Sequence, residues 1–365
     1  MAVDIATRRL HTQGLVNRPF ASAVEAVGWL AAVQAQDYTG AKWALGQRVR
    51  GLAEKELDRL YDAGAILRTH VMRPTWHFVL PVDVRWLLEL TTPRVKAATA
   101  TYDRRLEIDQ PLLHKSHTAM EAALAGGPLT RPELQARLTE MGIITDIQRM
   151  GHLLMHAELD RVIISGPRRG KKMTYAHFDE RVPAAGSPAS REEKLAELTR
   201  RYFTSHGPAQ LQDFSWWSGL TMADGRRGLE IVGPQLRQEK IGDKTYWNAA
   251  ASTRSISRRL VVHLLPNYDE YLVSYRDRTA ALDRAPDFSE TPFPLGGVLA
   301  NVVTVNGQVH GGWWRRRGAD SIVVEVARLD GLSQAERLGL ERAAKSMARF
   351  SGVKVTVAGA PTGGG

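Results

Sequence analysis

The sequence predicts an α+β protein with three tandem winged-helix units, followed by a C-terminal antiparallel β-rich domain of barrel-like form. Three observations support this prediction. Helix-forming segments followed by a hairpin signal occur three times along the 365 residues. Several helix starts are marked by capping boxes, in which Ser or Thr is followed three places later by Glu or Gln. Beyond residue 257 the pattern becomes that of strands, and Asn306-Gly307 is the strongest short hairpin signal in the chain.

The first unit is expected at residues 1–110. Ser22 and Glu25 form a capping box ahead of an amphipathic helix. Two further helices are expected, and two strand-like runs follow them with only three residues between, which predicts a hairpin. The expected helices lie around 8–15 and 53–63, and the expected strands at 66–71 and 75–79.

The second unit is expected at residues 111–182. Thr130 and Glu133 form a capping box at the start of one helix, and Thr145 and Gln148 form another at the start of the next. Strands are expected at 161–165 and 172–176, joined by a basic loop. Helix, turn, helix and basic hairpin in this order are typical of a winged helix.

The third unit is expected at residues 191–255, and the β-rich domain at 256–365. Helices at 192–205, 208–217 and 222–232 precede a hairpin that turns at Gly242-Asp243. In the last domain one helix, capped by Ser333 and Glu336, interrupts a series of strands. The expected strands lie at 259–265, 271–275, 298–305, 308–314, 322–327 and 353–357.

Composition limits the function classes. Lys and Arg number 49 against 39 Asp and Glu, which gives a net charge of +10 and a pI near 9.9 and favours a polyanionic partner, nucleic acid first. The chain has no cysteine, which excludes disulfides, thiolate catalysis and cysteine–zinc sites. It has no apolar run of membrane-spanning length and no apolar signal core. We therefore expect a cytoplasmic, nucleoid-associated protein without a membrane or protein partner.

The pair Gln34 and Gln36 follows the helix that Ser22 caps. If the helix continued through them, the two side chains would point about 200° apart, whereas an extended chain puts both on one side. Two neutral carboxamides directed at one spot can hold a water or the edge of a ligand. The alternative is a polar helix end without chemistry, and the spacing alone does not decide between the two.

Three other clusters carry candidate chemistry. The loop residues Arg168, Arg169, Lys171 and Lys172 lie at the tip of the second predicted hairpin, where they would contact DNA phosphates or remain a solvated turn. Trp313-Trp314 precedes three arginines and suits either a nucleic-acid surface or the core. His152 and His156 have the spacing of a metal pair on the helix face opposite its apolar stripe, but no third ligand is evident. We predict no metal site and no cofactor.

Three motifs together resemble the winged-helix DNA glycosylases of the AlkZ and YcaQ type over nearly the whole chain. They are the segments 33–37 (VQAQD), 73–77 (RPTWH) and 265–278 (LPNYDEYLVSYRDR), in that order. The YcaQ branch has Asp at the second position of the Gln-x-Gln triplet, so Gln36 makes the chain similar to the AlkZ branch. That branch is similar to a self-resistance enzyme for a DNA-crosslinking natural product.

The resemblance implies hydrolysis of the N-glycosidic bond of N7-alkylated purines in double-stranded DNA, including bulky adducts and interstrand crosslinks. It implies that Gln34 and Gln36 are catalytic. It also assigns DNA contacts to residues of the second and third motifs, beside the four of the basic hairpin. These contacts are Arg73, Thr75, Trp76, His77, Arg276 and Arg278.

The chemistry agrees with uncharged catalytic side chains. Alkylation at N7 makes the purine cationic, so it leaves as a neutral base without a strong general acid. Ordinary glycoside hydrolysis uses two carboxylates because its leaving group needs a proton. A carboxamide oxygen accepts a hydrogen bond from the attacking water but is not an efficient base, which limits the substrates to activated ones. The alternative function is a non-catalytic winged-helix transcriptional regulator, which would bind DNA and leave it intact.

Overall fold

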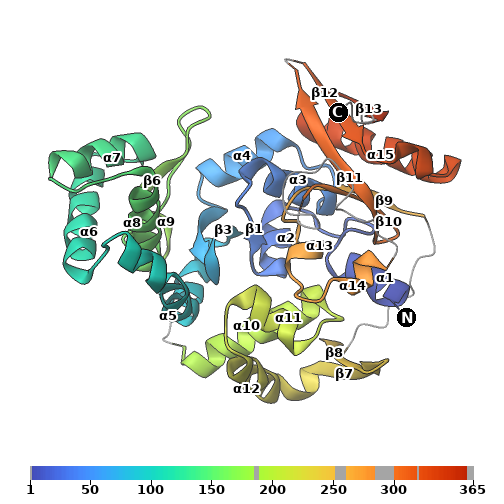
Figure 1. The fold of residues 1–365 in the computed structure, drawn as a ribbon, viewed down its shortest axis with the longest axis horizontal. Coiled ribbons are helices and arrows are strands. Elements are labelled where there is room, and N and C mark those ends of the chain that lie inside the picture. The colour runs from blue at the N-terminus through green and yellow to red at the C-terminus, as the bar shows by residue number, and fades with distance from the viewer. Residues whose placement is uncertain (1, 185–188, 251–259, 284–299, 319, 360–365) are drawn as a thin grey trace.

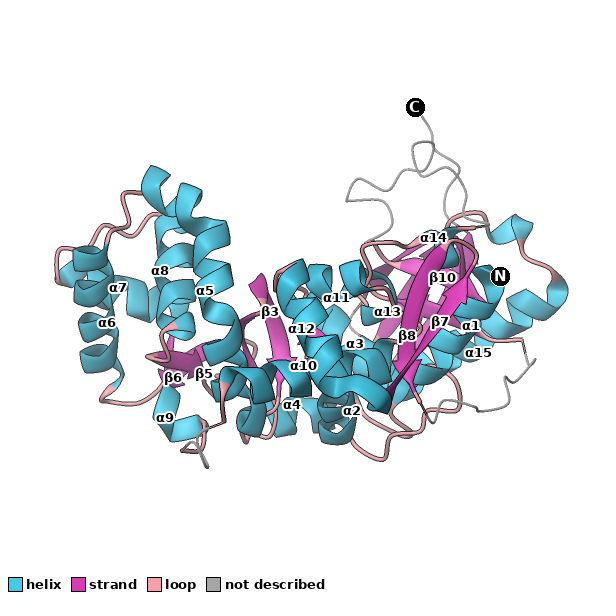
Figure 2. Ribbon diagram, turned by 90° about the horizontal axis from the view of Figure 1, so that it is seen from below, coloured by secondary structure: helices cyan, strands magenta, loops and turns pink. Residues whose placement is uncertain are grey.

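The computed structural model describes residues 2–184, 189–250, 260–283, 300–318 and 320–359. Helices and short sheets alternate along the chain. Helix α1 lies at the edge of the molecule, and the elements from α2 to β3 lie in its centre (Figure 1). Helices α5–α9 form a lobe on one side, α10–α12 lie below the centre, and the C-terminal sheet lies on the opposite side (Figure 1). In Figure 2 strand β3 lies between the α5–α8 lobe and helices α10–α12.

The first 105 residues contain more helix than the sequence predicts. The expected hairpin is confirmed as β2 and β3, which turn at Met72 with a φ of 63°. Strand β1 adds to it in the order β1-β3-β2. Helices α3 and the long α5 were not predicted. The elements are α1 (Ala2–Thr12), α2 (Ala23–Leu30), β1 (Val33–Gln34), α3 (Tyr38–Arg48), α4 (Glu54–Asp62), β2 (Leu67–Val71), β3 (Arg73–Val79) and α5 (Pro81–Arg105).

The capping box at Ser22 differs slightly from the expected form. The Ser22 hydroxyl accepts a hydrogen bond from the Glu25 N–H at 3.1 Å, as in the standard motif. The Glu25 carboxylate accepts from the N–H of Ala21 at 2.8 Å, one residue before the cap. Helix α2 starts where predicted, and it ends before Ala31, whose φ is 64°.

The segment 110–181 has the order helix, strand, two helices and hairpin, with strand order β4-β6-β5. The Thr130 box is present, because the Glu133 carboxylate accepts from the Thr130 N–H at 2.7 Å. The predicted box at Thr145 is wrong, because Asp146 caps helix α8. Ile147, the first residue of this helix, is 84% exposed and does not belong to its apolar face. The elements are α6 (Gln110–Leu124), β4 (Leu129–Thr130), α7 (Arg131–Glu140), α8 (Ile147–Leu159), β5 (Ile163–Ser165), β6 (Thr174–His177) and α9 (Phe178–Arg181).

The segment 191–249 agrees closely with the prediction, because each helix start carries its own polar cap and the turn of the hairpin is glycine-based. Ser190 and Thr221 both cap through capping boxes. The elements are α10 (Arg191–His206), α11 (Leu211–Ser218), α12 (Met222–Val232), the short η1 (Gly233–Gln235), β7 (Leu236–Ile241) and β8 (Lys244–Ala249). The predicted boundary at 255/256 lies outside the described residues.

The C-terminal segment forms a five-stranded sheet in the order β13-β12-β11-β10-β9. Its pairs are antiparallel except β12 with β13, which run parallel because helix α15 joins them. The described strands form an open sheet, and the predicted strand at 271–275 is instead helix α13. The elements are β9 (Val262–Leu265), α13 (Glu270–Val273), α14 (Thr279–Leu282), β10 (Val302–Val305), β11 (Gln308–Arg317), β12 (Ser321–Val326), η4 (Leu329–Gly331), α15 (Gln334–Ser351) and β13 (Lys354–Gly359).

One hydrophobic core joins the N-terminal elements to the C-terminal sheet. The ring of Trp43 on α3 contacts Phe350 on α15, with centroids 5.4 Å apart. The indole N–H groups of Trp43 and Trp313 donate to the carbonyls of Leu264 and Leu265 at 2.7 and 2.8 Å. Trp313 is therefore a core residue, which decides one of the alternatives left open for the Trp-Trp-Arg segment. This core fixes the end of β9 against α3, next to the candidate site.

The C-cap residue of helix α11, Gly219, packs against the β2–β3 turn. Gly219 has a φ of +71°, and a Cβ there would lie 2.1 Å from the Met72 carbonyl oxygen. Gly352 at the end of α15 has a φ of +72° with nothing within 4 Å of a Cβ. Replacing either glycine with alanine forces an L-residue into left-handed backbone, which costs about 1–2 kcal/mol. Only Gly219→Ala adds a backbone clash, so we expect it to cost roughly 1–3 kcal/mol more. Urea unfolding of the two variants measures this difference. Equal losses of unfolding free energy would mean that Gly219 is not in close contact with the turn.

Candidate active site

The two glutamines lie at the end of β1, where the chain is extended. Gln34 pairs with His77 across the sheet, and the Ala35 N–H donates to the Trp76 carbonyl at 2.7 Å. Gln34 is buried, with 6% of its surface exposed, whereas Gln36 is exposed. The extended backbone is the conformation that the paired-carboxamide hypothesis requires.

Both carboxamide oxygens have long hydrogen bonds to backbone N–H groups. The Gln34 oxygen accepts from the Gln36 N–H at 3.4 Å, and the Gln36 oxygen accepts from the Trp76 N–H at 3.3 Å. Each oxygen has a second lone pair that can accept a hydrogen bond from a water. The Arg68 guanidinium holds the Ala35 carbonyl between the two glutamines at 3.0 Å. The segment is therefore held by its neighbours, and both side chains keep acceptor capacity.

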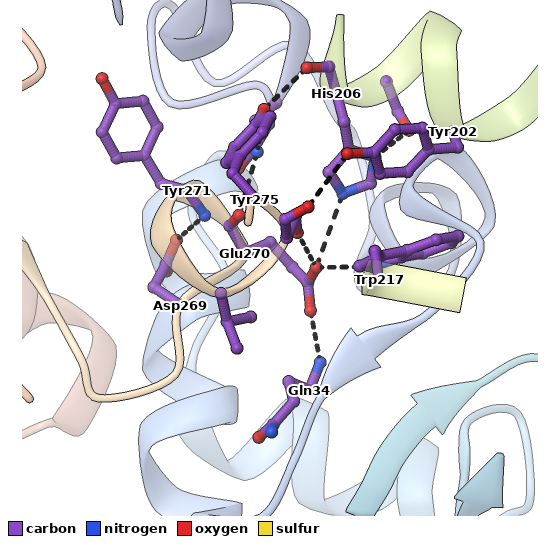
Figure 3. A network of polar contacts seen from close by, with 12 residues as sticks. Gln34, Tyr202, His206, Trp217, Asp269, Glu270, Tyr271 and Tyr275 are labelled. Atoms are coloured by element: carbon purple, nitrogen blue, oxygen red, sulfur yellow. Dashed lines mark hydrogen bonds and ion pairs between the residues drawn. The ribbon is translucent and has the colours of Figure 1, made fainter. Parts of the chain in front are cut away.

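A buried carboxylate lies directly behind Gln34 (Figure 3). The Gln34 N–H donates to Glu270 Oε1 at 2.6 Å. The Oε2 atom accepts from the Trp217 indole at 3.0 Å and from the Ser274 hydroxyl, and it lies 3.5 Å from His206 Nε2. Burial raises the pKa of Glu270, but these donors outweigh it and lower the pKa to about 2. A buried negative charge is therefore hydrogen-bonded to the backbone of Gln34.

Asp269 fixes the position of this carboxylate. It caps helix α13 by accepting from the Tyr271 N–H at 2.9 Å. The guanidinium of Arg48 at the end of α3 donates to both Asp269 oxygens, at 2.9 and 2.7 Å. Arg48 also donates to the Gln13 carbonyl at 3.1 Å. The acidic pair in the 265–278 motif therefore has two tasks: Asp269 anchors the turn to the N-terminal helices, and Glu270 contacts the glutamine segment.

The predicted contacts on β3 point in two directions. Trp76 is half-buried: its ring lies 4.3 Å from the His70 ring, and the Arg68 guanidinium lies 4.3 Å from its centroid. His77 is fully buried, and its Nδ1 contacts the Thr75 carbonyl at 2.9 Å. Burial lowers the pKa of His77 to about 3, so the ring is neutral. Because His77 is inside the protein, it does not offer a direct DNA contact in this conformation.

Thr75 and Arg73 are half-buried on the same strand. The Thr75 hydroxyl and two nitrogens of the Arg73 guanidinium are screened from solvent and have no hydrogen-bond partner among the described residues. Arg276 and Arg278 follow helix α13 on the neighbouring segment. Arg276 is exposed, whereas the Arg278 Nε donates to the Leu272 carbonyl at 2.9 Å.

The basic hairpin is less available to DNA than its sequence suggests. Arg168 donates to Asp62 from its backbone and side chain, at 2.7–3.0 Å, and its Nη1 lies 3.0 Å from Asp58. The side-chain hydrogen bond to Asp62 raises the pKa of Arg168. Arg169 forms an ion pair with Glu133. Lys171 and Lys172 are exposed, and their side chains have no partner within the described ranges.

These surroundings divide the four cations into two groups. Replacing Lys171 or Lys172 with alanine is expected to reduce the log–log salt slope of duplex binding by about 0.9 each, because each lysine would release its own counterion. Arg168→Ala should leave the slope unchanged. It should lower the unfolding free energy by roughly 1–3 kcal/mol, because Asp58 and Asp62 lose their cationic partner. Fluorescence titration over a salt series, with urea unfolding of each variant, measures both. If neither lysine substitution changes the salt slope, the tip of the hairpin is a solvated turn that does not contact DNA.

The histidine pair binds a carboxylate. His152 Nδ1 lies 2.8 Å from one oxygen of Asp103, and His156 Nε2 lies 3.1 Å from the other. His156 is buried, so this face of helix α8 packs against α5 and is not open to solvent. Within the described ranges no group of three or more side chains is arranged to hold a metal ion. No helix in the described part of the chain is both long and apolar enough to span a membrane.

Sequence reasoning did not assign roles to Glu270, His206, Trp217 or Trp216. One signal for Glu270 was present, because it directly precedes the apolar run Tyr-Leu-Val, and an acid beside such a run is rarely buried without partners. The other three residues come from α10 and α11, and only the folding of the chain brings them to helix α13.

Comparison with known proteins identifies the class. A family model described as "DNA glycosylase AlkZ-like" matches residues 27–350, which defines the class of protein as a DNA glycosylase. A relative from Streptomyces sahachiroi, "Interstrand DNA cross-link repair glycosylase", is 24% identical over 365 residues, with 94% of this chain and 95% of the relative covered. The chain belongs to the AlkZ-like family of DNA glycosylases. The solved structure of Streptomyces sahachiroi DNA glycosylase AlkZ has the same fold, with a TM-score of 0.79 at 21% identity over 98% of this chain and 99% of that one.

Proposed function

We propose that this DNA glycosylase hydrolyses the N-glycosidic bond of N7-alkylated purines in double-stranded DNA, with Gln34 and Gln36 as the catalytic residues. The observation that carries the proposal is an extended segment that presents two uncharged carboxamides and is held through the Gln34 backbone N–H by the buried Glu270 carboxylate. The glutamines would hold the attacking water, and the negative charge behind them would favour the positive charge that develops on the sugar. No residue at the pair supplies a strong acid, which suits a cationic base that leaves as a neutral one.

Bulky adducts and interstrand crosslinks are part of the proposed substrate range. The name of the Streptomyces sahachiroi relative refers to cross-link repair, and that relative aligns with nearly the full chain. A crosslinked base cannot rotate freely into a closed pocket, unlike the small lesions that many base-acting enzymes flip out. Gln36 is exposed, which suits a lesion that stays on the surface. The role would be DNA repair, including self-resistance to a DNA-alkylating natural product, in the nucleoid.

We further propose that the segments 1–110, 111–182 and 191–255 are winged-helix units and that 256–365 is a β-rich domain. Hairpins β2–β3, β5–β6 and β7–β8 each follow a group of helices, which supports this division. Three such units in series offer several basic elements to one duplex.

The product of the reaction tests the proposed function. DNA with a single N7-methylguanine is incubated with the protein and then heated in alkali, which cleaves the strand at an abasic site. We expect cleavage at the lesion position only. A protein that retards this DNA on a gel and leaves it uncleaved would instead be a non-catalytic DNA-binding regulator, and the catalytic assignment would fail.

A further inference from the structure

Two arginines from distant parts of the chain approach one tryptophan ring. Arg73 is the first residue of β3, and Arg278 follows helix α13. Their guanidinium carbons lie 5.9 and 5.5 Å from the ring centroid of Trp216 on α11. Trp216 is 41% exposed, and its indole N–H donates to the Val273 carbonyl at 3.0 Å, which fixes the ring. An exposed, fixed aromatic ring with two cations beside it is a favourable place for cation–π contact and for an anion.

Neither arginine has its donors satisfied. The Nε and Nη2 atoms of Arg73 and the Nη2 atom of Arg278 are screened from solvent and have no hydrogen-bond partner among the described residues. Burial lowers the pKa of both groups, and the proximity of Arg278 lowers that of Arg73 further. A buried charged donor without a partner costs stability, so a folded protein retains it when a ligand supplies the missing acceptor.

The carboxylates that act electrostatically on the two arginines, Glu270 and Asp213, already accept other hydrogen bonds. Glu270 accepts hydrogen bonds from Gln34, Trp217 and Ser274, as described above. Asp213 accepts from the N–H groups of Arg276 and Asp277 at 3.0 Å with one oxygen. Its other oxygen accepts from the Gln210 N–H at 2.9 Å and lies 3.7 Å from the Arg9 guanidinium. The cations therefore lack a free counterion within the described part of the chain.

The position of the cluster relates it to the glutamines. Arg73 lies four residues before His77 on β3, and His77 is the cross-strand partner of Gln34. At about 3.3 Å per residue, the two positions are roughly 13 Å apart along the strand. Gly219 packs against the Met72 carbonyl and the Arg73 side chain, so the arginine is held at this distance.

We propose that Arg73 and Arg278, beside the Trp216 ring, form a binding site for a phosphate group, and that its occupant is a backbone phosphate of the strand that carries the lesion. Guanidinium groups bind phosphate through paired N–H donors, and two of them can hold one phosphodiester from both sides. The nature of the occupant rests on the proposed function, whereas the affinity of the site for phosphate does not. The phosphate would set the register of the strand, so that the sugar of the damaged nucleotide reaches Gln34 and Gln36.

Inorganic phosphate tests the site without DNA. The unfolding temperature of the whole protein is measured against phosphate concentration, at constant ionic strength, for the parent and three variants. We expect saturable stabilisation of the parent, loss of this response in Arg73→Met and Arg278→Met, and its retention in the control Arg226→Met, an exposed position on α12. Without phosphate, Arg73→Met should unfold at the same temperature as the parent or higher, because it removes unpaired buried donors. A lower unfolding temperature together with an unchanged phosphate response would make Arg73 a structural residue and overturn the proposal.

Undamaged duplex then tests the occupant. Arg73→Met and Arg278→Met should each reduce the log–log salt slope of DNA binding by about 0.9. If the phosphate response is lost and the slope is unchanged, the site binds free phosphate and the assignment to the DNA backbone is wrong. Neither readout requires excision. A protein without glycosylase activity can therefore still pass both tests, and an active glycosylase can fail them.

Discussion

Gln34→Ala and Gln36→Ala are each expected to slow excision of N7-methylguanine by roughly 30- to 1,000-fold. Each variant removes a positioned hydrogen bond made mainly in the transition state, which is worth about 2–4 kcal/mol. Both side chains are uncharged, so the affinity for undamaged duplex should change little. We expect the larger loss at Gln36, because this exposed residue is the better placed to hold water, while Gln34 is buried. Single-turnover kinetics and fluorescence titration measure the two quantities on the same variants.

Gln36→Asp and Gln47→Ala serve as controls. A carboxylate at position 36 still accepts a hydrogen bond from water and offsets developing positive charge, so Gln36→Asp should retain activity on the small lesion. Gln47 is buried on α3 and belongs to neither motif, so Gln47→Ala reports the general effect of deleting a buried carboxamide. If Gln34→Ala and Gln36→Ala both excise the lesion at the parental rate, the two glutamines are a polar strand end without a catalytic role.

Glu270→Gln is expected to be the most destabilising conservative change in the site. The carboxylate receives donors at both oxygens, and an amide would turn an NH₂ group toward one set of them. We expect a loss of roughly 2–4 kcal/mol in unfolding free energy, because a buried donor is left without an acceptor. Excision should also fall, since Glu270 holds the Gln34 backbone and supplies the charge behind it. Glu336→Gln is the matched control, because Gln can replace Glu in the capping box of α15.

The pH dependence of stability separates charge from packing at this position. The pKa of Glu270 is lowered from an ordinary 4.5 to about 2 in the folded protein. Its contribution to stability is therefore complete above pH 4.5 and is lost as the pH falls from 4.5 through 2. The difference in unfolding free energy between the parent and Glu270→Gln should shrink over that range by roughly 3 kcal/mol. A difference that stays constant between pH 6 and pH 3 would show that Glu270 is not held ionised by its partners.

Much of the local structure follows from the sequence. The three helices and the hairpin of segment 191–249 are marked by polar caps and a glycine turn, which act over a few residues and need no tertiary contact. The same holds for helix α15, whose cap at Ser333 is confirmed. The β2–β3 hairpin was also predicted, although its turn at Met72 packs against Gly219 from a distant segment. The glutamine triplet and the two later motifs were visible as residue types in order, and they indicated the family before any geometry was known.

Helix α3 and helix α13 were missed for opposite reasons. Almost every residue of α3 from Gly40 onwards is buried, so the helix has no polar face and no periodicity to detect. Its Gly46 faces Phe350 of α15, where a Cβ would lie 2.6 Å from the ring, so a poor helix former is selected by packing. Helix α13 has the composition of a strand, but Asp269 caps it and Arg48 holds the cap from a distance of 221 residues.

The residues and their local turns were determined by the sequence alone, whereas their chemical environments were decided by the tertiary structure. Arg168 has the sequence context of a DNA contact, but Asp62, 106 residues earlier, neutralises it. Glu270 lies 236 residues after Gln34 and is nevertheless bonded to its backbone. Local propensity is set by neighbours along the chain, while burial, ion pairing and pKa are set by neighbours in space. For that reason the glutamine pair was recognisable from sequence, and the buried charge hydrogen-bonded to its backbone was not.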